Sequence, residues 1–156
     1  DMSPPGLYDP GLGAALQWRA ANMRAESGLS VGLDCRFDER RLRLDTRVLV
    51  FKLVRELLRN VVKHAGVTSA QVTVEESGDW LRIIVSDEGR GLEWKMEMSG
   101  ERNGRFGLWS VADRSRDVGG VFEVYTAIGG GARFVLKLPL PLASGWSDDF
   151  PLRLQG

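Results

Sequence analysis

Residues 46–65 carry the clearest periodic pattern in the chain, and this pattern constrains what the rest of the sequence can pack against. At about 100° per residue, the apolar side chains of this segment fall on one stripe. These residues are Phe51, Val54, Leu58, Val61 and Ala65. Three polar residues, Glu56, Asn60 and Lys63, cluster roughly opposite. The pattern predicts a helix that buries one face and offers the other, which is either solvated or part of a site.

The other elements follow from apolar spacing and from the glycines that interrupt it. We predict a first helix over residues 11–27 and a short helix from Leu108 to the glycines at 119 and 120. Alternating apolar residues predict strands at 31–37, 71–75, 80–87, 121–126 and 133–138. Residues 93–105 show no convincing period and are interpreted as a loop that could act as a lid.

The order of these elements favours one architecture. Helix, strand, helix, two strands, loop, helix and two strands are compatible with helices packed on one face of a sheet. The short connections leave little room for parallel crossovers. We therefore expect an α+β fold, a two-layer sandwich in which about three helices cover one face of a mixed, mostly antiparallel sheet.

Composition excludes several classes of function. The 156 residues suffice for one domain with a core, and 21 basic residues balance 21 acidic ones. This zero net charge argues against nucleic acid and anionic membranes as partners. Cys35 is the only cysteine, so an internal disulfide and a multi-cysteine metal site are excluded. No apolar run approaches the roughly 20 residues of a membrane span, so we expect a cytoplasmic fragment without membrane contact.

Asp87 is the most informative single residue. It ends a predicted strand and lies on the apolar face of that strand. A carboxylate there is costly unless a donor binds it, and an adenine amino group is a suitable donor. Gly89 and Gly91 follow, and they would let the backbone close on a ligand. The alternative is that Asp87 only opens a turn, with the glycines supplying backbone freedom.

Gly107 directly precedes the predicted short helix. It could let a phosphate approach the backbone N–H groups at the start of that helix, where the helix dipole favours negative charge. The alternative is a simple helix start. Together with Asp87 and the polar face of the long helix, the pattern predicts a site for ATP and magnesium.

Four segments in this order carry a family resemblance. They are Glu56-x-x-x-Asn60-x-x-Lys63-His64-Ala65, Asp87-x-Gly89-x-Gly91, Gly104-x-Phe106-Gly107-Leu108, and Gly129-x-Gly131 followed by Leu138-Pro139. They resemble the N, G1, G2 and G3 boxes of the GHKL ATPase superfamily, which implies a Bergerat-type fold. The segment from Val61 to Gly66 and the pattern Gly107-Leu108-x-x-Val111-x-x-Arg114 are similar to sensor histidine kinases of the nitrate-sensor type. The resemblance covers roughly residues 3–140.

The resemblance implies roles at the phosphate end of the nucleotide. Asn60 would hold the magnesium ion that bridges the phosphates, and Lys63 and His64 would lie near those phosphates. Glu56 would orient or activate the attacking group. Phosphoryl transfer depends mainly on such positioning and on charge compensation by metal and cations.

The resemblance also implies roles at the base and at the lid. Asp87 would accept a hydrogen bond from the adenine amino group, while Gly89 and Gly91 would let the backbone pass close to the base. Gly107 and Leu108 would close the lid end over the phosphates. Gly131 and Ala132 belong to the last box, where the family often has threonine in place of Ala132. That departure, and Arg105-Phe106 in the G2 box, put nucleotide affinity in question.

The resemblance finally implies partners. His64 is the only histidine and lies inside the N box, so the chain has no separate phosphoacceptor histidine. A sensor kinase of this kind would transfer the ATP γ-phosphoryl group to a histidine on a dimerisation domain, as a homodimer, for relay to a response regulator. We expect a lead-in at 1–30, the ATP-binding domain at 31–140 and a tail at 141–156. Two alternatives stay open: an anti-sigma-factor serine kinase of the same fold, and a degenerate, non-catalytic interaction module.

Overall fold

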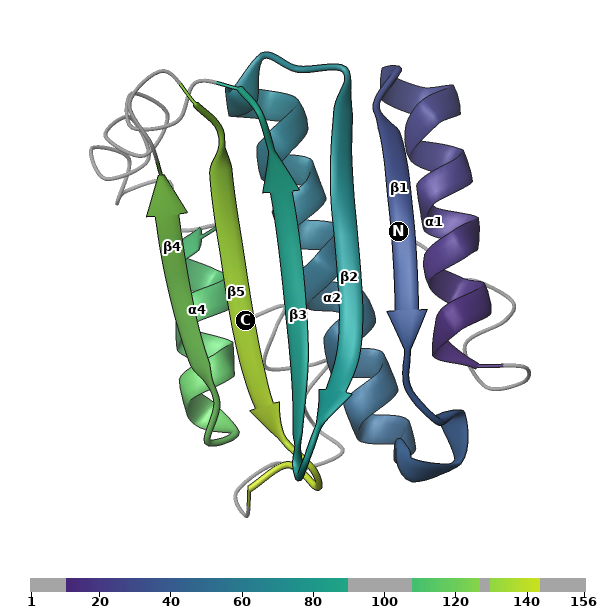
Figure 1. Cartoon of the computed structure of the whole chain (residues 1–156), viewed down its shortest axis with the longest axis vertical. Helices are drawn as coiled ribbons and strands as arrows, with labels where there is room; N and C mark the ends of the chain where they lie inside the picture. Colours follow the sequence, from purple (N-terminus) through teal and green to yellow (C-terminus); the bar gives the residue numbers. More distant parts are fainter. Residues whose placement is uncertain (1–10, 90–107, 127–129, 144–156) are drawn as a thin grey trace.

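The computed structural model describes residues 11–89, 108–126 and 130–143, with the backbone alone at 64 and 65. Five strands form one sheet, and three α-helices pack on one face of it (Figure 1). The apolar residues between these two layers form one core. The expected two-layer α+β architecture is therefore confirmed. Within the described ranges, no helix has the length and apolar composition that crossing a membrane requires.

The observed elements agree with the predicted ones to within a few residues. The α-helices and the short helical turns are α1 (Leu12–Ser27), η1 (Glu39–Arg41), α2 (Leu44–Asn60), η2 (Val61–Ala65) and α4 (Leu108–Asp117). The strands are β1 (Ser30–Arg36), β2 (Ser69–Ser77), β3 (Trp80–Asp87), β4 (Val121–Thr126) and β5 (Ala132–Pro139). The helix expected over 46–65 is divided, because its last turn, η2, is π-helical. The predicted loop at 93–105 and most of the predicted tail lie outside the described residues.

The sheet has the strand order β1-β2-β3-β5-β4 and is mixed and mostly antiparallel, as expected. Strands β1 and β2 are parallel, whereas the other three pairings are antiparallel. The connection between β1 and β2 runs through the 17-residue helix α2, which returns the chain along the length of the sheet. The expectation that parallel crossovers have little room was wrong, because α2 itself makes the crossover.

Helix α2 forms the centre of the core and lies behind β2 and β3 (Figure 1). Seven of its apolar residues are at most 3% exposed, and burial of each large one contributes about 1.5–3 kcal/mol. Those residues are Leu49, Val50, Phe51, Leu53, Val54, Leu57 and Leu58. Asn60 is also buried, with 4% of its surface exposed. The polar face predicted opposite the apolar stripe is therefore not simply solvated.

Candidate functional site

Asp87 is a buried carboxylate at the end of β3, with 7% of its surface exposed. Its Oδ1 atom accepts a hydrogen bond from the Gly89 backbone N–H at 2.7 Å. Its Oδ2 atom is buried and has no hydrogen-bond partner among the described residues. Burial raises the pKa of this carboxyl group, while the backbone N–H groups of Gly89 and Ala132 oppose that change. A buried acceptor without a donor is costly, so this oxygen is suited to binding an N–H group of a ligand.

Gly131 allows the start of β5 to pass directly over the end of β3. A Cβ atom at Gly131 would lie 1.5 Å from the backbone oxygen of Asp87 and 2.5 Å from the Cα atom of Glu88. Only a residue without a side chain fits this approach. Ala132 follows it, is 3% exposed, and is the cross-strand neighbour of Asp87.

Residue 132 lies beside Asp87 on the neighbouring strand, so its side chain could serve the unpaired oxygen. Cross-strand neighbours lie on the same face of a sheet, about 5 Å apart. A threonine at 132 would therefore place a hydroxyl donor beside the carboxylate, whereas the methyl group of Ala132 cannot donate. The departure noted in the sequence thus leaves Asp87 more dependent on a ligand.

Helix α2 places Glu56 and Asn60 one turn apart near its C-terminal end. The Nδ2 atom of Asn60 donates to the backbone oxygen of Glu56 at 2.9 Å. The Glu56 side chain is 24% exposed, and its Oε1 atom lies 3.7 Å from Nη1 of Arg59. After Asn60 the backbone widens into the π-helical turn, a feature that is frequent at functional sites.

Several cations surround Glu56 where α2 packs beside α4. Burial lowers the pKa values of Lys52, Arg55 and Arg114. Repulsion from Arg55 and Arg114 lowers the pKa of Lys52 further, whereas Glu56 raises those of the two arginines. The positive potential of this region would favour an anionic ligand. Lys52 and Arg55 carry no motif signal and were not predicted as site residues, although Lys52 lies one helical turn before Glu56 and shares its side of α2.

The structure locates some of the other predicted site residues and leaves others open. Lys63 is exposed in the π-helical turn, and Leu108 is the first residue of α4 and partly buried. The backbone of His64 lies in the same turn as Lys63. Gly91 and Gly107 lie outside the described residues, so their predicted roles stay predictions.

The residues present fit a magnesium site of a particular kind. Among the described residues, no group of three or more His, Cys, Asp or Glu side chains is arranged to hold a metal ion. Mg²⁺ is commonly bound through one or two protein oxygen ligands together with substrate phosphates and water. The Asn60 amide can supply one such ligand, so magnesium would be held jointly with a nucleotide.

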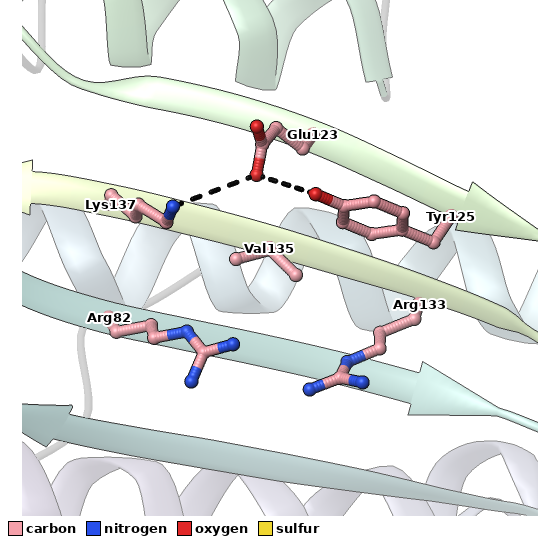
Figure 2. Close-up of a pocket in the computed structure, with 6 residues that line it drawn as sticks. All are labelled: Arg82, Glu123, Tyr125, Arg133, Val135 and Lys137. Carbon is pink, nitrogen blue, oxygen red and sulfur yellow. Dashed lines mark hydrogen bonds and ion pairs between the residues drawn. The ribbon is translucent and has the colours of Figure 1, made fainter.

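A separate pocket of about 310 Å³ lies on the other face of the sheet (Figure 2). It is lined by Arg82, Glu123, Tyr125, Arg133, Val135 and Lys137. Figure 2 shows these side chains in front of the strands, with the helices behind. Arg82 precedes Ile83 and Arg133 follows Ala132, so both point away from the core face that carries Asp87. This pocket is therefore not the site predicted from the sequence.

The sequence is similar to a known protein family and to two histidine kinases. Residues 45–142 match the family described as histidine kinase-, DNA gyrase B-, and HSP90-like ATPase. The sensor histidine kinase NarS of Mycobacterium tuberculosis is 32% identical over 140 residues, which are 90% of this chain and 32% of NarS. An uncharacterized sensor-like histidine kinase of Chloroflexus aurantiacus is 28% identical over 144 residues, or 24% of its own length. The chain thus spans about a quarter to a third of these relatives.

Solved structures share the fold. The Erythrobacter litoralis EL346 blue-light activated histidine kinase aligns with a TM-score of 0.64 and 24% identity, covering 83% of this chain and 42% of that one. The Acinetobacter baumannii histidine kinase AdeS aligns with a TM-score of 0.60 and 14% identity, covering 83% and 63%. These similarities agree with the family match, which covers helix α2 and strand β3, the strand that carries Asp87. The chain belongs to the histidine kinase-, DNA gyrase B- and HSP90-like ATPase family.

Proposed function

We propose that this chain is the ATP-binding catalytic domain of a sensor histidine kinase. It would transfer the γ-phosphoryl group of ATP to a histidine on a separate dimerisation domain, for relay to a response regulator. The observation that carries the proposal is the buried Oδ2 atom of Asp87, which has no donor among the described residues. The names of the curated relatives, both sensor-type histidine kinases, support the same class of activity.

Asp87 suits the base of the nucleotide. Adenine carries an N6 amino group, which is a neutral donor with two N–H bonds. One of these N–H bonds would satisfy the buried Oδ2 atom, while Oδ1 keeps its bond from Gly89. A base that offers a carbonyl at this position, such as guanine, would place two acceptors against each other. The site would therefore select adenine over guanine.

The C-terminal end of α2 is suited to binding the phosphates of the nucleotide. Asn60 would bind the magnesium ion, and Lys63 and His64 would lie near the phosphates. The cations near Glu56 would offset the negative charge that the phosphates bring. Gly91, Gly107, Leu108, Gly131 and Ala132 would complete the boundary of the site. Bound magnesium would supply charge compensation and bridge the phosphates.

The same proposal includes the surroundings of the domain. The full-length protein would act as a homodimer in the cytoplasm, or as the cytoplasmic part of a membrane-bound sensor. Its partners would be the dimerisation domain that carries the phosphoacceptor histidine and a response regulator. Residues 1–30 would connect this domain to the dimerisation helices.

Calorimetric titration of ATP, with and without magnesium, tests the adenine contact. Asp87→Asn should abolish detectable binding, because it replaces an acceptor with an amide donor that repels the amino group. Asp79→Asn is the matched control, since Asp79 lies exposed in the turn between β2 and β3. If Asp87→Asn binds ATP as tightly as Asp79→Asn does, the proposed role of Asp87 is wrong.

Titration of adenosine beside Mg·ATP tests the phosphate end. Asn60→Ala should reduce the affinity for Mg·ATP about tenfold or more, because the lost amide bound the metal rather than the base. The affinity for adenosine should stay within about twofold of wild type. An equal loss for both ligands would contradict the assignment of magnesium to Asn60.

A second candidate function rests on Ala132. Without the hydroxyl that a threonine would supply there, the domain could keep its fold and serve as an interaction module that binds no nucleotide. Under that reading, wild type and Asp87→Asn would both fail to bind ATP. The ATP titration therefore separates the two candidates.

A further inference from the structure

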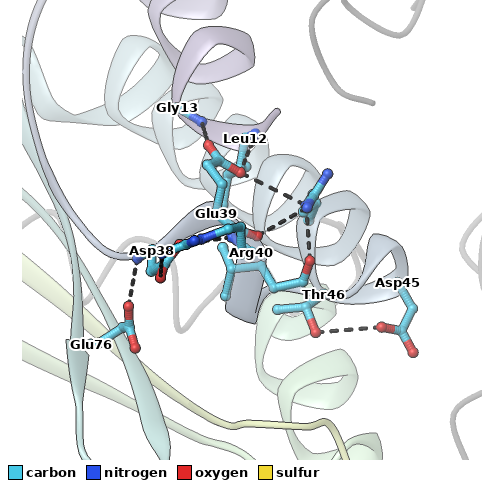
Figure 3. Close-up of polar contacts among 10 residues, drawn as sticks. Leu12, Gly13, Asp38, Glu39, Arg40, Asp45, Thr46 and Glu76 are labelled. Carbon is cyan, nitrogen blue, oxygen red and sulfur yellow. Dashed lines mark hydrogen bonds and ion pairs between the residues drawn. The ribbon is translucent and has the colours of Figure 1, made fainter. Parts of the chain in front are cut away.

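The first turn of α1 is capped by a side chain from a different element. Glu39, in the η1 turn after β1, accepts hydrogen bonds from two backbone N–H groups of α1 (Figure 3). Its Oε2 atom lies 2.7 Å from the Gly13 nitrogen, and its Oε1 atom lies 3.1 Å from the Leu12 nitrogen. Gly11 precedes the helix and has no side chain with which to cap it. Glu39 therefore performs from 26 residues away the function that a local cap usually performs.

Gly11 makes room for this carboxylate, and Gly13 lies against it. A Cβ atom at Gly11 would lie 2.4 Å from Oε1 of Glu39, and one at Gly13 would lie 3.4 Å from Oε2. Gly11 also has a φ of 125°, which L side chains rarely adopt. The sequence Gly11-Leu12-Gly13 is thus fitted to receive Glu39.

Glu39 also touches the start of α2. The Nε atom of Arg47 lies 3.8 Å from Oε1 of Glu39, and Nη2 of Arg47 donates to the backbone oxygen of Glu39 at 2.9 Å. Arg47 also donates from Nε to the backbone oxygen of Leu42 at 3.0 Å. One carboxylate therefore joins the first turn of α1 to the first turn of the helix that carries Asn60.

From this geometry we infer that Glu39 is a positioning residue for phosphotransfer, an inference that rests on the proposed function. The body of α1 is held by burial of Ala15 and Leu16, and in the first turn the cap acts together with the burial of Leu12. Glu39 fixes the first turn, which is the point where the preceding chain joins the domain. It thereby sets the direction in which that chain leaves, and so where a phosphoacceptor domain is held relative to the nucleotide. An acceptor misplaced by about 1 Å can slow transfer about a hundredfold.

The matched pair Glu39→Gln and Glu76→Gln separates positioning from stability. Glu76, on β2, lies in the same corner and accepts from the Asp38 backbone N–H at 2.6 Å (Figure 3). Among the described residues it has no hydrogen bond or ion pair with α1. Both substitutions remove one charge and replace one carboxylate oxygen: the two oxygens of Glu39 accept from two N–H groups of α1, and those of Glu76 accept from the Asp38 N–H and from Arg41. A purely stabilising role for Glu39 predicts that the two variants behave alike.

The first measurement needs no enzymatic activity. Spin labels at Asp9→Cys and Ser77→Cys, in a Cys35→Ser background, report the direction of the chain before α1. Glu76→Gln should give the same distance distribution as wild type, and Glu39→Gln should give a broader one. An equally broad distribution in wild type, or no change in Glu39→Gln, would overturn the inference.

The second measurement uses the full-length protein. Glu39→Gln should lower the autophosphorylation rate about ten- to a hundredfold at saturating ATP, while KM for ATP stays within about twofold of wild type. Glu76→Gln should match wild type in both. A weaker ATP affinity in Glu39→Gln would show that the residue acts through the nucleotide site, which overturns the inference. If wild type binds ATP yet forms no phosphohistidine, the proposed function fails, and the label distances still decide the role of Glu39.

Discussion

At the scale of single residues, Asp87 combines a cost to the fold with a proposed role in binding. The carboxylate is buried at the end of an apolar strand face, and one of its two oxygens lacks a donor among the described residues. Such a group destabilises the unliganded protein, and its persistence is explained if a ligand supplies the missing donor. The substitution that removes binding should therefore also make the empty domain more stable.

This cost makes the stability of the domain depend on pH. Burial raises the pKa of Asp87 above its ordinary value of 3.8, so the folded state binds this proton more tightly than the unfolded state. The stabilising contribution of the protonated Asp87 carboxyl group is therefore fully present below pH 3.8. It is lost as pH rises through the raised pKa of the folded state. Asp87→Asn removes the titration.

Urea unfolding of wild type and Asp87→Asn across this pH range measures the effect. The variant should gain stability relative to wild type as pH rises, reaching a difference on the order of 1 kcal/mol near neutral pH. A difference that stays constant or falls with rising pH would contradict an uncompensated carboxylate at this position.

Asp87 and Asn60, the two central residues of the proposed site, are both buried. The sequence predicted the burial of only one of them. The burial of Asp87 follows from its place on an alternating apolar strand, and the structure confirms it. The burial of Asn60 was missed, because the predicted stripe of Phe51, Val54 and Leu58 left out the leucines on its other side. Leu49, Leu53 and Leu57 lie eleven, seven and three residues before Asn60, on its side of α2, and all are buried.

At the scale of elements, the junction of β3 and β5 depends on Gly131. A methyl group there would overlap the backbone of Asp87, and no rotation of a side chain can relieve that overlap. The ends of the two strands would have to separate, which moves Asp87 and Ala132 apart. We expect Gly131→Ala to destabilise the domain by about 3 kcal/mol and to remove nucleotide binding.

Gly28→Ala is the matched control for this prediction. Gly28 ends α1 with a φ of 79°, and nothing lies within 4 Å of the Cβ atom that alanine would add. Its cost should be conformational alone, about 1 kcal/mol, with nucleotide affinity unchanged. Chemical denaturation and ATP titration of both variants supply the comparison. Equal losses of stability would show that contact with Asp87 is not what requires a glycine at 131.

The elements themselves were largely predictable, whereas one of their connections was not. Apolar spacing placed the five strands and three helices to within a few residues. A mixed sheet was expected, but β1 and β2 were not identified as its parallel pair, because strand patterns carry no direction and α2 was counted as a layer rather than as a crossover. The π-helical turn after Asn60 was missed as well, since a wider turn leaves no mark in an apolar stripe.

At the scale of the whole molecule, α1 is part of the core. Leu12, Leu16 and Met23 of α1, and Leu29 after it, are all at most 7% exposed. The family match begins only at residue 45, yet these side chains pack into the same core as α2 and the sheet. The limits 31–140 for the ATP-binding domain stay a prediction, and the burial of α1 argues for a longer folding unit.

Two shortened chains test which unit folds. At about 2 kcal/mol for each of the four large side chains, removing residues 1–30 withdraws roughly 8 kcal/mol of burial, which is comparable to the whole stability of a typical domain. A chain that begins at residue 31 should therefore show no cooperative thermal unfolding by circular dichroism. A chain that begins at Gly11 keeps α1 and the Glu39 cap and should unfold in one transition near that of the full chain. Cooperative unfolding of the shorter chain would show instead that α1 is an appendage and that the domain begins at residue 31.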